Sequence, residues 1–254
     1  MTARPVVALD GVRPDEVHVV RVFADADGRH GNELGIVLAS ARTDGRELAI
    51  AQALGFSETV FVDAVDAVDA PGAGPRAASI RILTPARELP FAGHPTVGTA
   101  WWLASRGIEV DQLRVAAGVV DVSREADVVR VTADPAWGPD FAWRELPSVA
   151  DLLALDLPAA VAQATAADAT VDHLYAWAWI DEAAGAVRAR MVAPALGVPE
   201  DEATGSAALR LTALLGRDLR ITQGRGSELV TRLLADGRAE VGGRTVVDRV
   251  IPLP

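Results

Sequence analysis

Residues 91–105 read FAGHPTVGTAWWLAS and join a Gly-His loop to an apolar segment that opens at a proline. Proline is favoured in the first turn of a helix, where its missing N–H is not needed, so we expect a helix over Pro95–Ser105. The amides of Gly93 and His94 would then point outward with the positive end of the helix dipole, which suits a carboxylate. Taken alone, the pattern also fits a His94 that merely caps the helix.

A second junction of this kind stands at residues 200–215, which read EDEATGSAALRLTALL. Three acids precede a Gly-Ser pair, and we expect a helix over Ser206–Leu215 that is capped by Ser206 or Thr204. Acids are common before helices in any protein, so they do not indicate a site by themselves. Two such helix starts facing each other across a cleft would hold a small acid from both sides.

Residues 57–62, SETVFV, alternate in the manner of a strand. Glu58 therefore lies on the same face as Val60 and Val62, toward an apolar side. Burial raises the pKa of a carboxyl group, which would make Glu58 a proton carrier near neutral pH. A glutamate at a strand edge that reaches solvent fits the same pattern.

The order along the chain is strands, a buried helix and strands, and then the same again. This order predicts an α+β protein with two halves, an N-terminal half over residues 1–115 and a C-terminal half over residues 116–243. Asn32 is expected to cap a short helix. We expect further helices at residues 33–38, 46–54, 148–155 and 159–167, and strands at residues 16–23, 56–65, 78–83, 173–180, 187–192, 219–223, 228–234, 239–241 and 245–251.

Composition excludes several classes of function. The chain has 24 basic and 35 acidic residues, a net charge of −11, which argues against a nucleic acid or an anionic membrane as partner. Residues 1–13 lack the apolar segment of a signal peptide, and no stretch approaches the roughly 20 apolar residues of a membrane span, so we expect a cytoplasmic protein. The absence of cysteine and lysine excludes thiolate nucleophiles and Schiff-base chemistry.

Cofactor and metal sites are not expected. Residues 72–77 match the G-x-G-x-x-A pattern of dinucleotide-binding proteins, but a strand follows them where a helix is needed, and we interpret them as a hairpin loop. The acids at residues 63, 66 and 69 have no neighbouring histidine and are too sparse for a calcium loop. Acid–base chemistry must therefore come from carboxylates, from the four histidines or from Tyr175.

Four motifs in one order give the chain a family resemblance. They are Gly31-Asn32, SETVFV at 57–62, FAGHPTVGTA at 91–100 and EDEATGSA at 200–207, and Gln223-Gly224 also fits. The chain resembles the PhzF-like family, which is similar to the phenazine-biosynthesis isomerase and has the diaminopimelate epimerase fold. The matches span residues 31–224, nearly the whole chain.

The resemblance implies two pseudo-symmetric domains, each a mostly antiparallel sheet or barrel around a central helix, with the active site between them. The last strand, over residues 244–254, would return to the first domain. Glu58 would be the general acid/base of a cofactor-independent isomerase, acting in a homodimer on a small carboxylate-bearing metabolite. The residues that would bind this substrate are His94, Asp201 and Ser206, the amides near Gly93 and Gly205, and Asn32 and Thr204.

Two features of the sequence depart from related enzymes. Racemases of this fold use a pair of thiols, and this chain has no cysteine, so one carboxylate that carries a proton between carbons is the expected chemistry. The family usually has a proline after Glu-Asp, and this chain has Glu202 there. The added charge is expected to raise the pKa of Asp201, or the change of residue to reshape the loop. The alternative function is a catalytically inactive, small-acid-binding or structural homodimer of the same fold.

Overall fold

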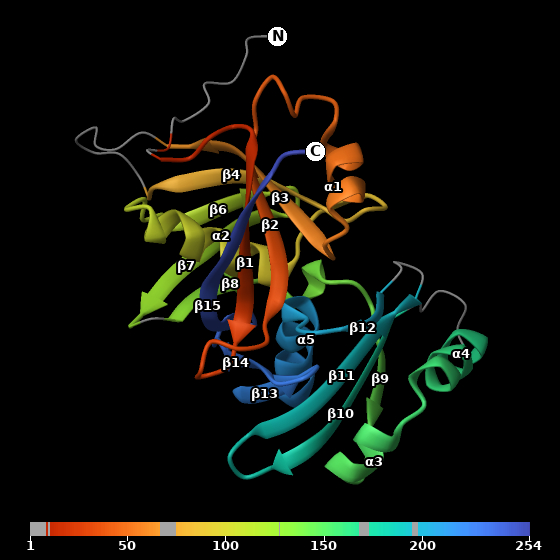
Figure 1. Ribbon diagram of the computed structural model, residues 1–254. Coiled ribbons are helices and arrows are strands. Elements are labelled where there is room, and N and C mark those ends of the chain that lie inside the picture. Colours follow the sequence, from red (N-terminus) through yellow and green to blue (C-terminus); the bar gives the residue numbers. More distant parts are fainter. Residues whose placement is uncertain (1–8, 10, 67–74, 127, 168–172, 195–197) are drawn as a thin grey trace.

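The computed structural model describes residues 9, 11–66, 75–126, 128–167, 173–194 and 198–254. Its strands form one sheet in the order β1-β2-β3-β4-β6-β7-β8-β15-β14-β13-β11-β10-β9 (Figure 1). Because β1 also pairs with β15, eight of the strands close into a ring, and the short β5 lies at its edge. The ring strands are β1 (Glu16–Ala24), β2 (Asn32–Leu38), β3 (Glu58–Val65), β4 (Ala77–Leu83), β6 (Gln112–Val115), β7 (Gly118–Glu125), β8 (Val128–Ala133) and β15 (Ala239–Pro252), with β5 (Glu88–Leu89) on β4.

Helix α2 (Gly93–Ser105) lies inside this ring and packs against β1, β8 and β15. Every residue from Gly93 to Ala100 is buried, as the apolar character of the segment predicts. Gly98 lets the helix approach the sheet closely, because a Cβ there would lie 2.6 Å from Val22 and 2.7 Å from Leu34. The ring therefore holds α2 in a fixed position.

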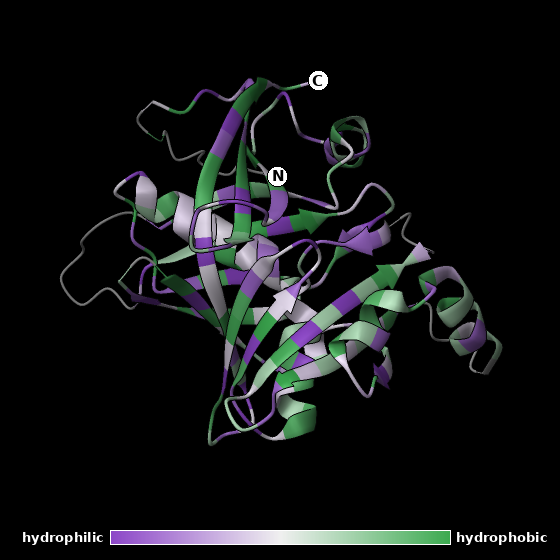
Figure 2. Cartoon of the chain, turned by 60° about the horizontal axis from the view of Figure 1, so that its bottom comes forward, coloured by the Kyte–Doolittle hydropathy of each residue, from purple (hydrophilic) through white to green (hydrophobic). Residues whose placement is uncertain are grey.

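The remaining strands continue the sheet beyond β15: β14 (Ser227–Leu233), β13 (Leu219–Gln223), β11 (Ala186–Ala193), β10 (Leu174–Asp181), β9 (Ala142–Glu145) and the short β12 (Val198–Asp201) on β11. Helix α5 (Gly205–Leu215) packs against β14 and β15. Figure 2 shows alternating hydrophobic and hydrophilic bands along strands of the sheet, a pattern that β11 has, with Val187 and Ala189 buried between half-buried neighbours. The other helices are α1 (Glu47–Leu54), the 3₁₀ helix η1 (Pro135–Trp137), α3 (Val149–Ala154) and α4 (Leu157–Ala167).

The α+β class and the two central helices are confirmed, and two details of the sequence interpretation are wrong. Residues 33–38 form strand β2 and not a helix capped by Asn32. The two strands expected after residue 239 are one continuous strand, β15, which pairs with β8 and β14 first and with β1 from Arg244 onward. The expected boundary at residue 115 lies between the paired strands β6 and β7, and the division of the chain into two halves stays a prediction.

The first half of the glycine-rich match, residues 72–74, lies outside the described residues, and the interpretation of the match as a hairpin loop stays a prediction. Within the described part of the chain, no helix combines the length and the apolar character that a membrane crossing requires.

Candidate active site

Helices α2 and α5 begin in direct contact with each other. A Cβ on Gly93 would lie 2.7 Å from the carbonyl carbon of Gly205, and a Cβ on Gly205 would lie 2.8 Å from the Cα of Gly93. Only glycine fits at both positions, because real Cβ atoms do not approach other atoms so closely. The two helix starts face each other as the sequence predicts, but Gly93 and Gly205 are in contact and no cleft lies between them.

Neither helix start is capped by a side chain. The N-cap residues are Ala92 for α2 and Thr204 for α5, and no side-chain hydrogen bond caps either helix. The expectation that Ser206 or Thr204 caps α5 is wrong, because Ser206 lies inside the helix and the Thr204 hydroxyl turns to Asp201. Amides in the first turn of both helices are thus left without a capping side chain, as an anion site requires.

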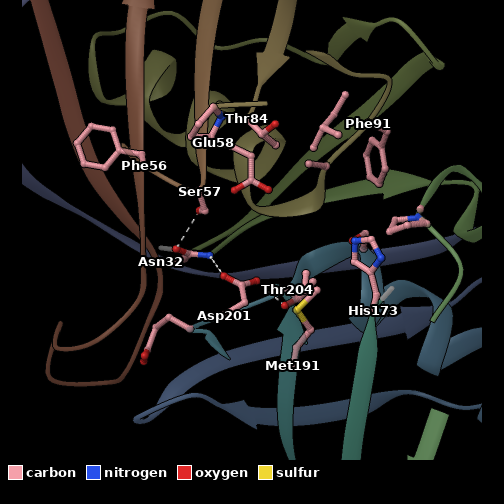
Figure 3. Close-up of a pocket in the computed structure, with 18 of the residues that line it drawn as sticks. Asn32, Phe56, Ser57, Glu58, Thr84, Phe91, His173, Met191, Asp201 and Thr204 are labelled. Atoms are coloured by element: carbon pink, nitrogen blue, oxygen red, sulfur yellow. Dashed lines mark hydrogen bonds between the residues drawn. The ribbon is translucent and has the colours of Figure 1, made fainter. Parts of the chain in front are cut away.

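A cavity of about 630 Å³ opens beside these helix starts and receives side chains from both parts of the molecule (Figure 3). Of the predicted site residues, five line it: Asn32, Glu58, Asp201, Thr204 and Ser206. The other three lie behind its wall among the buried residues: Gly93, His94 and Gly205.

Glu58 opens strand β3 and turns its carboxyl group into the cavity, opposite Asp201 (Figure 3). Its side chain is 18% exposed, and its Oε2 atom lies 3.5 Å from Nδ1 of His94. The neighbours on its strand face, Val60 and Val62, belong to the apolar core around α2, as the alternation predicts. Burial raises the pKa of Glu58 to about 7, against which a hydrogen bond with Ser57 acts weakly.

His94 is buried, with 3% of its side chain exposed. Burial lowers its pKa to about 4, although the nearby charge of Asp201 acts in the opposite direction. The imidazole is therefore neutral at physiological pH and supplies no positive charge to Glu58. It can still donate or accept a hydrogen bond at Nδ1.

Asp201 ends strand β12 and is held by two donors (Figure 3). The Asn32 amide donates to its Oδ1 over 2.8 Å, and the Thr204 hydroxyl donates to its Oδ2. The pKa of Asp201 is raised to about 6, first by burial and then by the charge of Glu58. The two carboxyl groups of the site thus come from different parts of the sheet and influence each other.

Glu202 does not act on Asp201 as the sequence led us to expect. Its Oε1 accepts hydrogen bonds from the Arg225 amide over 3.1 Å and from the Ser227 hydroxyl over 2.9 Å, and its Oε2 accepts one from Nε of Arg225 over 3.0 Å. Ser227 in turn accepts a hydrogen bond from the amide of Gly31 over 2.9 Å. The carboxylate therefore joins the β13–β14 turn to the loop before β2, and it is not among the causes of the raised pKa of Asp201.

Sequence reasoning missed the apolar wall of the cavity and its further histidine. Phe91 and Trp137 meet edge to face at 5.9 Å between ring centres, and Phe141 meets His173 at 5.7 Å. These four residues line the cavity together with Phe56 and Met191. Because they come from separate segments and read as core residues one by one, no sequence signal marks them as a wall.

Comparison with known proteins places this geometry in a family. The model of the family described as phenazine biosynthesis-like protein, PhzC-PhzF, matches residues 20–159, more than half of the chain. The chain belongs to this family. A trans-2,3-dihydro-3-hydroxyanthranilate isomerase of Pseudomonas chlororaphis is 31% identical over 85% of this chain and 81% of that enzyme. The enzyme of the same name from Pseudomonas aeruginosa is 36% identical over 60% of this chain and 65% of that enzyme, which is just under two thirds of its length.

Solved structures of this family share the fold. A phenazine biosynthesis protein of the PhzF family from Bacillus anthracis superposes with a TM-score of 0.75, at 17% identity, over 96% of this chain and all of that one. A probable proline racemase from Agrobacterium radiobacter gives a TM-score of 0.60, at 14% identity, over 94% of this chain and 92% of that one. The expected fold of PhzF proteins and related racemases and epimerases is thereby confirmed.

Proposed function

We propose that this protein is a cofactor-independent isomerase that moves a proton on a small carboxylate-bearing substrate, with Glu58 as the general acid/base. The observation that carries the proposal is the position of Glu58, which lies in the cavity beside both helix starts with its pKa raised to about 7. A group with such a pKa can accept and return a proton near neutral pH. The names of the relatives from Pseudomonas, which are isomerases, support the same class of reaction.

The substrate carboxylate is assigned to the starts of α2 and α5. The amides there have no side-chain cap, and the two helix dipoles point their positive ends to the same place. Ser206, Thr204 and Asn32 add polar groups to the cavity wall on this side. Phe91, which directly precedes the N-cap residue of α2, and Phe141 also line the cavity, and they suit the apolar part of a small ring.

The proposed step moves one proton and needs no redox partner. The Glu58 carboxylate takes a proton from one substrate carbon, the electron pair of the broken C–H bond shifts into the substrate, and Glu58 returns the proton to another carbon. General acid–base help of this kind contributes about 10²–10⁴-fold in rate. Positioning between the two helix starts supplies a further part.

The test uses trans-2,3-dihydro-3-hydroxyanthranilate, the compound in the names of the relatives. Incubation in D₂O with detection by proton NMR is expected to show one deuterium entering a carbon position, and Glu58→Gln is expected to abolish this exchange. Glu228→Gln, a matched change at an exposed glutamate of β14, is the control and should keep it. Exchange that continues unchanged in Glu58→Gln would remove Glu58 from the role.

The alternative is an inactive protein that binds small acids. It would show saturable binding of the compound, by calorimetry, with no exchange at any carbon in the wild-type protein. That outcome would overturn the isomerase proposal and support the alternative. The homodimer implied by the family resemblance belongs to the proposal, and sedimentation equilibrium measures it.

A further inference from the structure

Gln223, the last residue of β13, is fully buried next to the site and uses its whole hydrogen-bonding capacity. Its Oε1 accepts from the amide of Thr204 over 3.3 Å and from the hydroxyl of Tyr175 over 3.2 Å. Its Nε2 donates to the carbonyl of Asp201 over 3.0 Å and to the hydroxyl oxygen of Thr204 over 2.8 Å. None of these bonds involves the cavity directly.

The direction of each bond is fixed by backbone groups. A backbone N–H can only donate and a backbone carbonyl can only accept, so the amide of Gln223 has one orientation that satisfies both Thr204 and Asp201. The Nε2 atom therefore donates to the Thr204 hydroxyl oxygen. The hydroxyl hydrogen is left to point at Oδ2 of Asp201.

The other oxygen of Asp201 is fixed in the same way. Asn32 donates through Nδ2 to the carbonyl of Ala203 over 3.0 Å, which sets its amide orientation. The same Nδ2 donates to Oδ1 of Asp201, while Oδ1 of Asn32 accepts from Ser57. Both oxygens of Asp201 thus receive a hydrogen bond, and neither faces an acceptor among these partners.

Glu58 has fewer donors around it. Its Oε2 is buried and, among the described residues, accepts no hydrogen bond, and the hydrogen bond of its carboxyl group is with Ser57. The charge of Glu58 raises the pKa of Asp201, so the two carboxyl groups do not both ionise easily, and the one with more donors keeps the negative charge. The titratable groups that face Asp201 are Glu58 from β3, His94 from α2 and Tyr175 from β10, and the Tyr175 hydroxyl is already directed at Gln223.

We propose that Gln223 and Thr204 are positioning residues that hold Asp201 as an ionised acceptor by fixing hydrogen-bond direction, so that Glu58 is the carboxyl group of the pair that binds and releases the mobile proton. The claim that Asp201 is ionised does not depend on any catalysed reaction. The claim that the proton of Glu58 takes part in a reaction rests on the proposed function. Gln223 acts through the Thr204 hydroxyl and does not touch the cavity itself.

The test measures the pKa of Asp201 by carboxyl ¹³C NMR in a Glu58→Gln protein, where the second carboxyl group of the pair is gone. Thr204→Val keeps the shape of the side chain and removes the hydroxyl, and it is expected to move the Asp201 titration up by about one pH unit or more. Thr204→Ser keeps the hydroxyl and should leave the titration in place. The proposal would be overturned if the pKa of Asp201 were the same in Thr204→Val and Thr204→Ser, whether or not both values differ from that of the Glu58→Gln protein.

The role of Gln223 is tested by adding Gln223→Met to the Glu58→Gln protein twice, once with Thr204 present and once with Thr204→Val. With Thr204 present, the change frees the hydroxyl to rotate and should raise the pKa of Asp201. With Thr204→Val, it should add nothing, because the hydroxyl through which Gln223 acts is absent. Equal effects in the two backgrounds would show that Gln223 does not act through Thr204. None of these outcomes depends on activity, so the inference can fail or succeed independently of the isomerase proposal.

Discussion

Replacing Glu58 by glutamine is expected to stabilise the protein, and increasingly so as the pH rises. The folded protein keeps the carboxyl group of Glu58 in a mostly buried place, which raises its pKa from 4.5 to about 7. The native state therefore binds the proton more tightly than the unfolded chain does. The tighter proton binding by Glu58 adds to the free energy of unfolding of the folded protein. This addition is fully present below about pH 4.5 and is lost as the pH rises through about 7.

The size of the effect follows from the shift. Each pKa unit corresponds to about 1.4 kcal/mol, so the pKa change of Glu58 amounts to about 3 kcal/mol in all. Between about pH 5 and about pH 8.5 the wild-type protein should lose about 2.5 kcal/mol relative to Glu58→Gln, which carries no charge at any pH. Functional carboxyl groups often reduce stability in this way.

Urea denaturation of both proteins, followed by tryptophan fluorescence over this pH range, measures the difference in the free energy of unfolding. Asp201 titrates in both proteins, and the charge of Glu58 contributes to its raised pKa, so the comparison measures Glu58 together with its effect on Asp201. A difference that stays constant between about pH 5 and about pH 8.5 would refute the reasoning, because it would mean that Glu58 titrates alike in the folded and unfolded chain.

Two further variants probe the frame of the site. Gly93→Ala places a methyl group within 2.8 Å of Gly205 and should lower the free energy of unfolding by about 1–3 kcal/mol in urea denaturation; wild-type stability would contradict the contact between the helix starts. Glu202→Ala removes the carboxylate that joins the β13–β14 turn to the loop before β2 and should cost about 1–3 kcal/mol of stability. Carboxyl NMR should find the pKa of Asp201 nearly unchanged in this variant. A clear fall in that pKa would show that the charge of Glu202 raises it in the wild-type protein.

The sequence predicted which residues gather at the cavity better than it predicted the strands around it. The helix starts and Glu58 could be found because each depends on local chemistry: proline and glycine at a junction, and a carboxyl group within an alternating strand. Strand β2 was misread as a helix because both of its faces are buried, Ile36 in the core around α2 and Val37 in a second core with α1. A short apolar run of this kind carries no period that separates a strand from a helix.

Other errors have a similar cause, since they concern contacts between distant segments. Gly242 and Gly243 fall between the two strands expected at residues 239–241 and 245–251, but they permit close passage of one strand. A Cβ on Gly242 would lie 2.6 Å from the Val129 carbonyl, and one on Gly243 would lie 2.6 Å from Phe23. Pairing of β7 and β8 with the ring is likewise a long-range property. The hydrogen-bond partners of Glu202 lie beyond position 223, and no local pattern assigns them.

The central claim is that the carboxyl group of Glu58 is shielded from solvent enough to hold a proton near neutral pH. It lies beside the point where the two helix starts meet. Titration of the wild-type protein with ¹³C-labelled glutamate, assigned by its loss in Glu58→Gln, measures this pKa directly. The account predicts a midpoint of about 7 for the Glu58 resonance. A midpoint at the ordinary glutamate value near 4.5 would contradict it.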